Sequence, residues 1–128
     1  MSDFRKLLVW RKAHVLAIRV HRLANGIRGQ QNAALRSQLN RSAMSIPANI
    51  VEGSGQESRR EFGRFLSYAA NSANELEWHL MVARDTGVIN LNEYSAHVSP
   101  TVEVRKMLHG LMRRVALSAS DRSSTKRG

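Results

Sequence analysis

The chain has 128 residues, about the length of one domain, and 42% of them are hydrophobic, which suffices for a packed core and argues against general disorder. It contains no cysteine, so disulfides, thiol nucleophiles and Cys-ligated metal sites are excluded. Lys and Arg number 20 against 10 for Asp and Glu, and the net charge of +10 predicts attraction to polyanions, nucleic acid first and an anionic membrane surface second.

The N-terminal half predicts two helices. Hydrophobic residues recur at helical spacing from about residue 7 to 24, where Asn25-Gly26 ends the pattern. A second stripe runs from about residue 32 to 51, and we expect Pro47 to bend that helix because proline removes a backbone donor. No apolar run approaches the roughly 18 residues of a membrane span, and the N-terminus lacks a signal-peptide pattern, so we expect a cytoplasmic protein.

The C-terminal half predicts two more helices. Ser58 to Glu61 has the form of a capping box, and a strong apolar stripe follows until Gly87. The fourth helix is expected from about residue 92 to 118, with Pro100 as a kink or the end of a separate first turn. The sequence therefore predicts an all-α, antiparallel up-down four-helix bundle over residues 1–117 and a disordered basic tail over residues 118–128.

The excess positive charge is confined to the two ends of the sequence. Residues 1–31 carry seven basic and one acidic residue, and residues 88–128 carry seven and three, whereas the middle helices are balanced. Clustered Lys and Arg at helical spacing predict a phosphate-binding surface, with an ordinary solvated face as the alternative. The candidate nucleic-acid-binding residues are Arg11, Lys12, Arg19, Arg22, Lys106, His109 and Arg113, supplemented by the tail residues Arg122, Lys126 and Arg127. Because aromatic residues are scarce, we expect contacts mainly to the nucleic-acid backbone.

Two further patterns need an explanation. Val15 and Ile18 lie opposite the main stripe of the first helix, which favours an oligomer interface over two scattered exposed residues. Arg41, Ser45, Asn49 and Glu52 share one face of the second helix beside its apolar stripe. With Ser58 and Glu61, this line is interpreted first as a structural polar network near the loop before the third helix, and second as a direct RNA or catalytic site.

The second helix also carries a specific resemblance. The run Leu39-Asn40-Arg41-Ser42-Ala43-Met44-Ser45-Ile46-Pro47-Ala48-Asn49-Ile50-Val51-Glu52-Gly53 strongly resembles the four-helix-bundle proteins encoded by intervening sequences in bacterial 23S ribosomal RNA genes. The positions from Ser58 to Leu76 and the segment Leu8 to Ala13 support it, so the similarity extends over residues 4 to 115.

The resemblance implies a bundle that assembles into a ring-shaped homo-oligomer, a homopentamer. The family is similar in fold to the accessory variability determinant of diversity-generating retroelements, which implies nucleic acid, and a reverse transcriptase or another ribonucleoprotein, as partners. Two positions depart from the family pattern. Asn71-Ser72 stands where a glycine usually precedes the serine, and Gln56 stands where an arginine is common.

Three functions are therefore considered, in this order. The first is a non-enzymatic, ring-forming, nucleic-acid-binding accessory protein without a cofactor. The second is a structural or interaction module that meets an acidic protein or membrane. A metal-dependent nuclease is a distant third: several carboxylates could in principle hold metal ions, but Glu75 and Glu77 lie on different helix faces and cannot converge. We expect Glu61 to act as a cap and Glu75 to pair with an arginine.

Overall fold

A computed structural model describes the backbone of residues 3–127 and the side chains of residues 3–118. Four α-helices form the molecule: α1 (Leu8–Gly26), α2 (Ala33–Ser54), α3 (Arg59–Asp85) and α4 (Leu91–Arg127). Short 3-10 helices, η1 (Phe4–Lys6) and η2 (Gln30–Asn32), precede α1 and α2. Residues 3–127 contain no strand, so the all-α prediction is confirmed.

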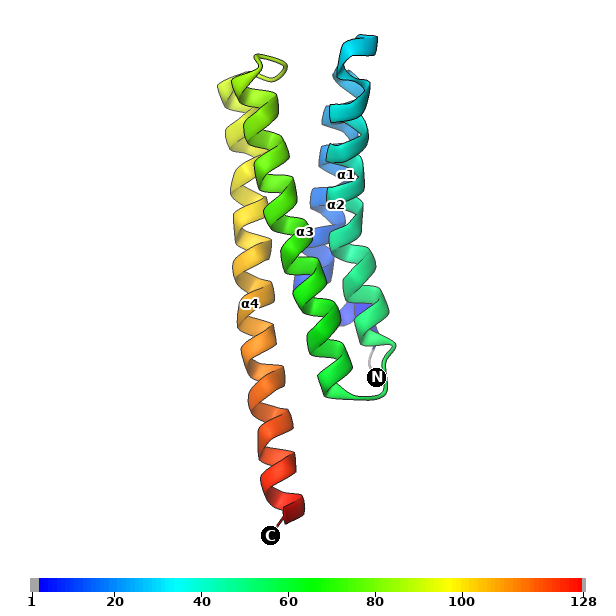
Figure 1. Ribbon diagram of the computed structural model, residues 1–128, viewed down its shortest axis with the longest axis vertical. Coiled ribbons are helices and arrows are strands. Elements are labelled where there is room, and N and C mark those ends of the chain that lie inside the picture. Colours follow the sequence, from blue (N-terminus) through cyan, green and yellow to red (C-terminus); the bar gives the residue numbers. More distant parts are fainter. Residues whose placement is uncertain (1–2, 128) are drawn as a thin grey trace.

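The helices pack as a four-membered bundle. In Figure 1 the chain passes up through α1, down through α2, up through α3 and down through α4, whose last turns extend beyond the other helices. Helix α1 contacts α2 and α4, and α3 contacts the same two helices, so α1 and α3 are diagonal partners. The seam between α1 and α4 is the least extensively packed of the four.

The core consists of the predicted apolar stripes. Fully buried leucine and isoleucine side chains come from every helix, including Leu16, Leu39, Ile46, Leu76 and Leu108. Alanines fill the positions between them, which lets the helix backbones approach closely. Burial of these side chains is the main term that stabilises the bundle.

The structure differs from the predicted boundaries in α4. Pro100 neither ends the helix nor splits off a first turn, since α4 is continuous around it. The helix also continues through residues 118–127, where a disordered tail was expected, so no helix end marks the boundary at 117 and 118. No proline or glycine occurs between Ser118 and Arg127, which explains why the backbone can remain helical there. Helix α2 likewise includes Pro47 without interruption.

Candidate nucleic-acid interface

The core packing of α1 determines where its cations lie. Ala13, Leu16 and Val20 turn one face of α1 into the core, so residues on the opposite face remain in solvent. That outer face carries four of the predicted phosphate-binding residues, all exposed: Arg11, Lys12, Arg19 and Arg22. The helix therefore presents a row of positive charge about 11 residues long, or roughly 16 Å at 1.5 Å per residue.

Helix α4 contributes cations beside this row. Val104, Leu108 and Val115 are buried in the core, and the predicted Lys106, His109 and Arg113 are exposed. Arg114, which the helical spacing of the prediction did not include, is also exposed and lies at the edge of α4 that meets α1. Arg122, Lys126 and Arg127 lie outside the residues whose side chains are described.

Two of the predicted cations already have partners inside the molecule. The Lys12 ammonium lies 2.6 Å from the Glu103 carboxylate on α4. Arg19 donates a hydrogen bond of 3.0 Å to the backbone carbonyl of Ala96. That carbonyl lies four residues before Pro100, which has no N–H to offer it, so Arg19 satisfies an acceptor that the proline leaves free. Both residues join α1 to α4, whereas Arg11 and Arg22 have no hydrogen bond or ion pair to any described side chain.

Apolar side chains lie among these cations. Val15 and Ile18, the predicted oligomer interface, are 55% and 39% exposed, and Leu8 on the same outer face is 52% exposed. These fractions are high for aliphatic side chains, so α1 presents an apolar ridge between its arginines.

Two crevices follow the α1–α4 seam. The first, the Gly110 crevice, has a volume of about 460 Å³, apolar walls and the cations Lys106 and Arg114 at its edge. Its walls are Leu7, Leu8, Val9, Met107 and Leu111. The second, the Pro100 crevice, has a volume of about 280 Å³ and is edged by Arg11, Lys12, Arg19 and Glu103. Its walls are Val15, Leu16, Pro100 and Val104.

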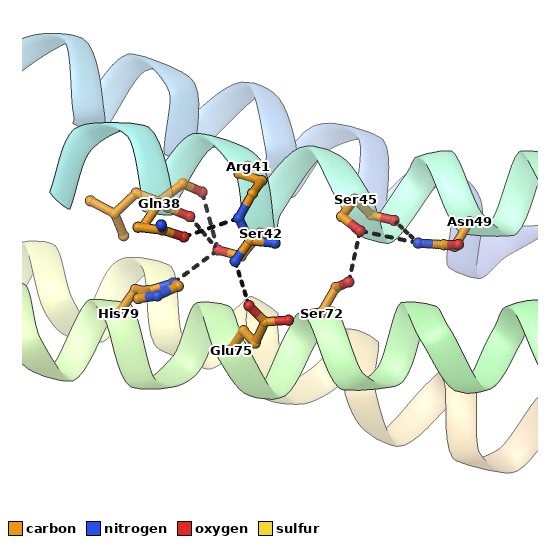
Figure 2. Close-up of polar contacts among 9 residues, drawn as sticks. Gln38, Arg41, Ser42, Ser45, Asn49, Ser72, Glu75 and His79 are labelled. Atoms are coloured by element: carbon orange, nitrogen blue, oxygen red, sulfur yellow. Dashed lines mark hydrogen bonds and ion pairs between the residues drawn. The ribbon is translucent and has the colours of Figure 1, made fainter. Parts of the chain in front are cut away.

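The predicted polar line of α2 lies in a different seam, against α3. Figure 2 shows Arg41 and Glu75 facing each other as an ion pair across the seam, the kind of partner expected for Glu75. One turn along, the hydroxyls of Ser45 and Ser72 are 2.8 Å apart, and the Asn49 amide donates to the Ser45 backbone carbonyl at 2.8 Å. Arg41, Ser45 and Asn49 therefore each have a partner within the bundle, which is what a structural role of these three residues requires.

The same seam holds a histidine that the sequence analysis had not singled out. His79 is 7% exposed, and its Nδ1 lies 3.2 Å from the Ser42 hydroxyl. Burial lowers the pKa of His79 below its ordinary value, since a charged ring loses hydration there. Glu75 opposes that shift and Arg41 adds to it.

The remaining members of the predicted network do not join it. Glu52 is exposed, and its carboxylate makes no hydrogen bond or ion pair with the described side chains. The Ser58 hydroxyl accepts a 3.1 Å bond from the backbone N–H of Glu61, which is the expected cap of α3. The Glu61 carboxylate pairs instead with Arg64 at 3.0 Å, so the capping box is half formed. At the two departures from the family pattern, Asn71 is exposed and Gln56 donates to the Glu52 carbonyl at 3.2 Å.

Two classes of site are not found in the described part of the chain. No three His, Cys, Asp or Glu side chains there gather as ligands for a metal ion. No helix in that part combines the length and the hydropathy that crossing a membrane requires.

Comparison with known proteins gives a match over most of the chain. The family model for the 23S rRNA-intervening sequence protein matches residues 5–110. A crystal structure of a protein with unknown function from the S23 ribosomal protein family of Bacteroides thetaiotaomicron superposes with a TM-score of 0.78 at 29% identity, over 82% of this chain and 98% of that one. A search of curated proteins gave no match. The chain belongs to the 23S rRNA-intervening sequence protein family.

Proposed function

We propose that this chain is a non-enzymatic accessory protein that binds nucleic acid, RNA in preference to DNA, through phosphate contacts on the outer faces of α1 and α4. The observation that carries the proposal is the row of exposed cations on two neighbouring helices, in a chain whose net charge is +10. The name of the family, which refers to 23S rRNA, favours RNA as the polyanion.

The proposal includes assembly. An antiparallel up-down bundle with an apolar ridge at Val15 and Ile18 has a surface on which a second copy can pack, and the family resemblance favours a ring, specifically a homopentamer. Such a ring would repeat, around one axis, those cations that the contact between copies leaves exposed, which strengthens binding to a long polyanion. We place the protein in the cytoplasm and propose a reverse transcriptase or another ribonucleoprotein as a further partner.

The second candidate is a module that binds an acidic protein. The crevices of the α1–α4 seam favour it, because apolar walls edged by cations also suit an acidic amphipathic segment. A metal-dependent nuclease remains a distant third candidate, and it predicts magnesium-dependent cleavage that Glu52→Gln abolishes.

The test is a matched pair of charge reversals. Replacing Arg11 and Arg22 on α1 by Glu lowers the formal charge from +10 to +6, and replacing Arg60 and Arg64 on α3 by Glu lowers it equally. Since α3 is diagonal to α1, the proposal predicts that RNA affinity falls by about tenfold or more in the α1 variant only, with a shallower salt slope. Circular dichroism checks that both variants stay helical. An equal loss in both would mean that net charge, not this surface, attracts RNA.

A further inference from the structure

The α1–α4 seam combines exposed apolar walls with cations at their edges, which a surface used only for phosphate contacts does not need. Leu8, in the wall of the Gly110 crevice, is 52% exposed, and that crevice includes neither Val15 nor Ile18. We propose that the seam selects single-stranded over duplex nucleic acid, with an unpaired base in the Gly110 crevice and phosphates at its edge. The inference rests on the proposed function and names the class of nucleic acid that the same surface takes.

The reason lies in what each form of nucleic acid exposes. In a duplex the flat, apolar faces of the bases are stacked on one another, so a protein surface meets mainly phosphates and sugars. A single strand can splay its bases toward the protein, where aliphatic walls remove the apolar base faces from water, while its phosphates remain outside. Only the single strand can therefore use both the walls and the edge of the Gly110 crevice.

The Gly110 crevice has two cations of α4 at its edge. Lys106 and Arg114 lie eight residues apart on α4, about 12 Å along the helix axis. Gly110 lies halfway between them and has no side chain to cover the crevice. A Cβ built at Gly110 would meet only the guanidinium ends of Arg113 and Arg114, both at 3.8 Å, so the position has room for a larger side chain.

The interruption of the apolar surface argues against a docked helix. An amphipathic helix of a partner requires a continuous apolar stripe over several turns. The Lys12–Glu103 ion pair crosses from α1 to α4 and breaks that stripe. The pair thereby separates the Gly110 crevice from the rest of the seam, which suits a single base better than a helix of several turns.

The experiment fills one crevice and compares two probes. Gly110→Leu places an apolar side chain in the Gly110 crevice and replaces a poor helix former within a helix, so the fold is expected to remain. Ala116→Leu adds similar bulk at an exposed position of α4 outside both crevices and serves as the control. The probes are polyuridine and the same strand annealed to polyadenosine, measured by fluorescence anisotropy with the full chain.

We expect Gly110→Leu to weaken the binding of only one of the two probes. The unmodified chain should bind polyuridine more tightly than the duplex, and Gly110→Leu should weaken polyuridine binding about three- to tenfold, because the apolar contact to one base is lost, with duplex binding unchanged. Ala116→Leu should alter neither. Equal binding of both probes, with no effect of Gly110→Leu, would overturn this inference and leave the proposed function standing. Salt-independent or absent binding of both would overturn the proposed function and the inference together. If Gly110→Leu abolishes binding of an acidic amphipathic peptide and leaves polyuridine binding intact, the inference is overturned and the crevice is assigned to a protein partner.

Discussion

At the scale of single residues, Arg19 was predicted to bind phosphate because of its charge, but the structure gives it a structural role. Its guanidinium donates to the Ala96 carbonyl, which the absent N–H of Pro100 leaves without its helical partner. Ala96 is exposed, so the Arg19 guanidinium replaces the missing N–H at a carbonyl that only water would otherwise reach, which helps α4 to accommodate the proline. Ala96 is 77 positions from Arg19 in the sequence, and no local pattern indicates that the two residues pair.

This pairing makes a prediction about stability. Arg19→Ala should lower the free energy of unfolding by about 1 kcal/mol, because the Ala96 carbonyl loses its donor. In a Pro100→Ala background the new backbone N–H can reach that carbonyl, so the same Arg19→Ala change should cost clearly less. Urea unfolding of the four proteins in this double-mutant cycle measures the difference. An identical loss in both backgrounds would show that Arg19 acts without Pro100.

A second prediction concerns His79 and the pH dependence of the free energy of unfolding. Its pKa is lowered from the ordinary value of 6.5, mainly by burial, so below that pH the unfolded state binds a proton more readily than the folded state. The contribution of His79 to stability is therefore present above pH 6.5 and is lost as the pH falls through the folded-state pKa. Urea unfolding between about pH 7.5 and about pH 5 should show this decline.

The control for this prediction uses an exposed histidine. His79→Gln retains a hydrogen-bonding group near Ser42 but cannot titrate, so it should reduce the decline in stability at low pH. His109→Gln, at an exposed position of α4, should leave the decline as it is in the unmodified chain. The same pH profile in both variants would assign the decline to other groups.

At the scale of elements, the four helices could be predicted because each carries an apolar stripe of helical period. The cap at Ser58 was visible for the same local reason, since cap and partner are three residues apart. The start of α4 had a similar signal that was overlooked. Asn90 and Glu93 each accept a bond from the other's backbone N–H, at 2.8 and 2.9 Å, and form a complete capping box.

The contacts between helices could not be predicted in the same way. The Arg41–Glu75 and Ser45–Ser72 pairs depend on the register of α2 against α3, which packing of the whole core determines. The crevices likewise exist only because α1 and α4 pack less extensively than the other neighbours. Sequence periodicity indicates which face of a helix is polar but not which residue lies opposite.

The next prediction concerns one glycine in α2 and one in α3, whose replacement by alanine should change stability in opposite directions. A Cβ at Gly53 would lie 2.9 Å from the Phe65 Cβ and 3.0 Å from the Phe62 ring, and the Phe65 atom cannot rotate away. Gly53→Ala should therefore lower the free energy of unfolding by about 1–3 kcal/mol, as overpacking does. A Cβ at Gly63 would meet only Val115, at an ordinary 3.7 Å. Gly63→Ala should stabilise the protein by up to about 1 kcal/mol through helix propensity.

Thermal unfolding of the two variants separates packing from propensity. Both changes add one methyl group within a helix, so propensity alone predicts that both stabilise the protein. A rise in melting temperature for Gly53→Ala would show that α2 and α3 can separate slightly at that end of the bundle. Opposite shifts would establish that close approach of the two helices requires glycine at position 53.

At the scale of the whole molecule, the uneven distribution of charge is the feature that the sequence indicated most directly. The excess belongs to the first and last segments of the sequence, and the fold places α1 beside α4, so the two basic segments become one surface. No local sequence pattern indicated that Glu103 would lie within that surface. It is the only acidic residue among those that edge the two crevices of the described chain.

The last prediction concerns Glu103. Its carboxylate lies 2.6 Å from the Lys12 ammonium, at the position where a phosphate would otherwise bind. Both side chains are about half exposed, so the pair contributes little to stability, and its removal should leave the fold intact. Glu103→Gln should raise RNA affinity about two- to fivefold at low salt, since Lys12 becomes available and a repulsive charge is lost, and the gain should shrink as salt screens both effects. Glu57→Gln, which removes the same charge at an exposed position of the α2–α3 loop, should have a smaller effect. If the two variants gain affinity equally across the salt series, the α1–α4 seam has no special share in binding, and the +10 charge of the whole chain accounts for the attraction.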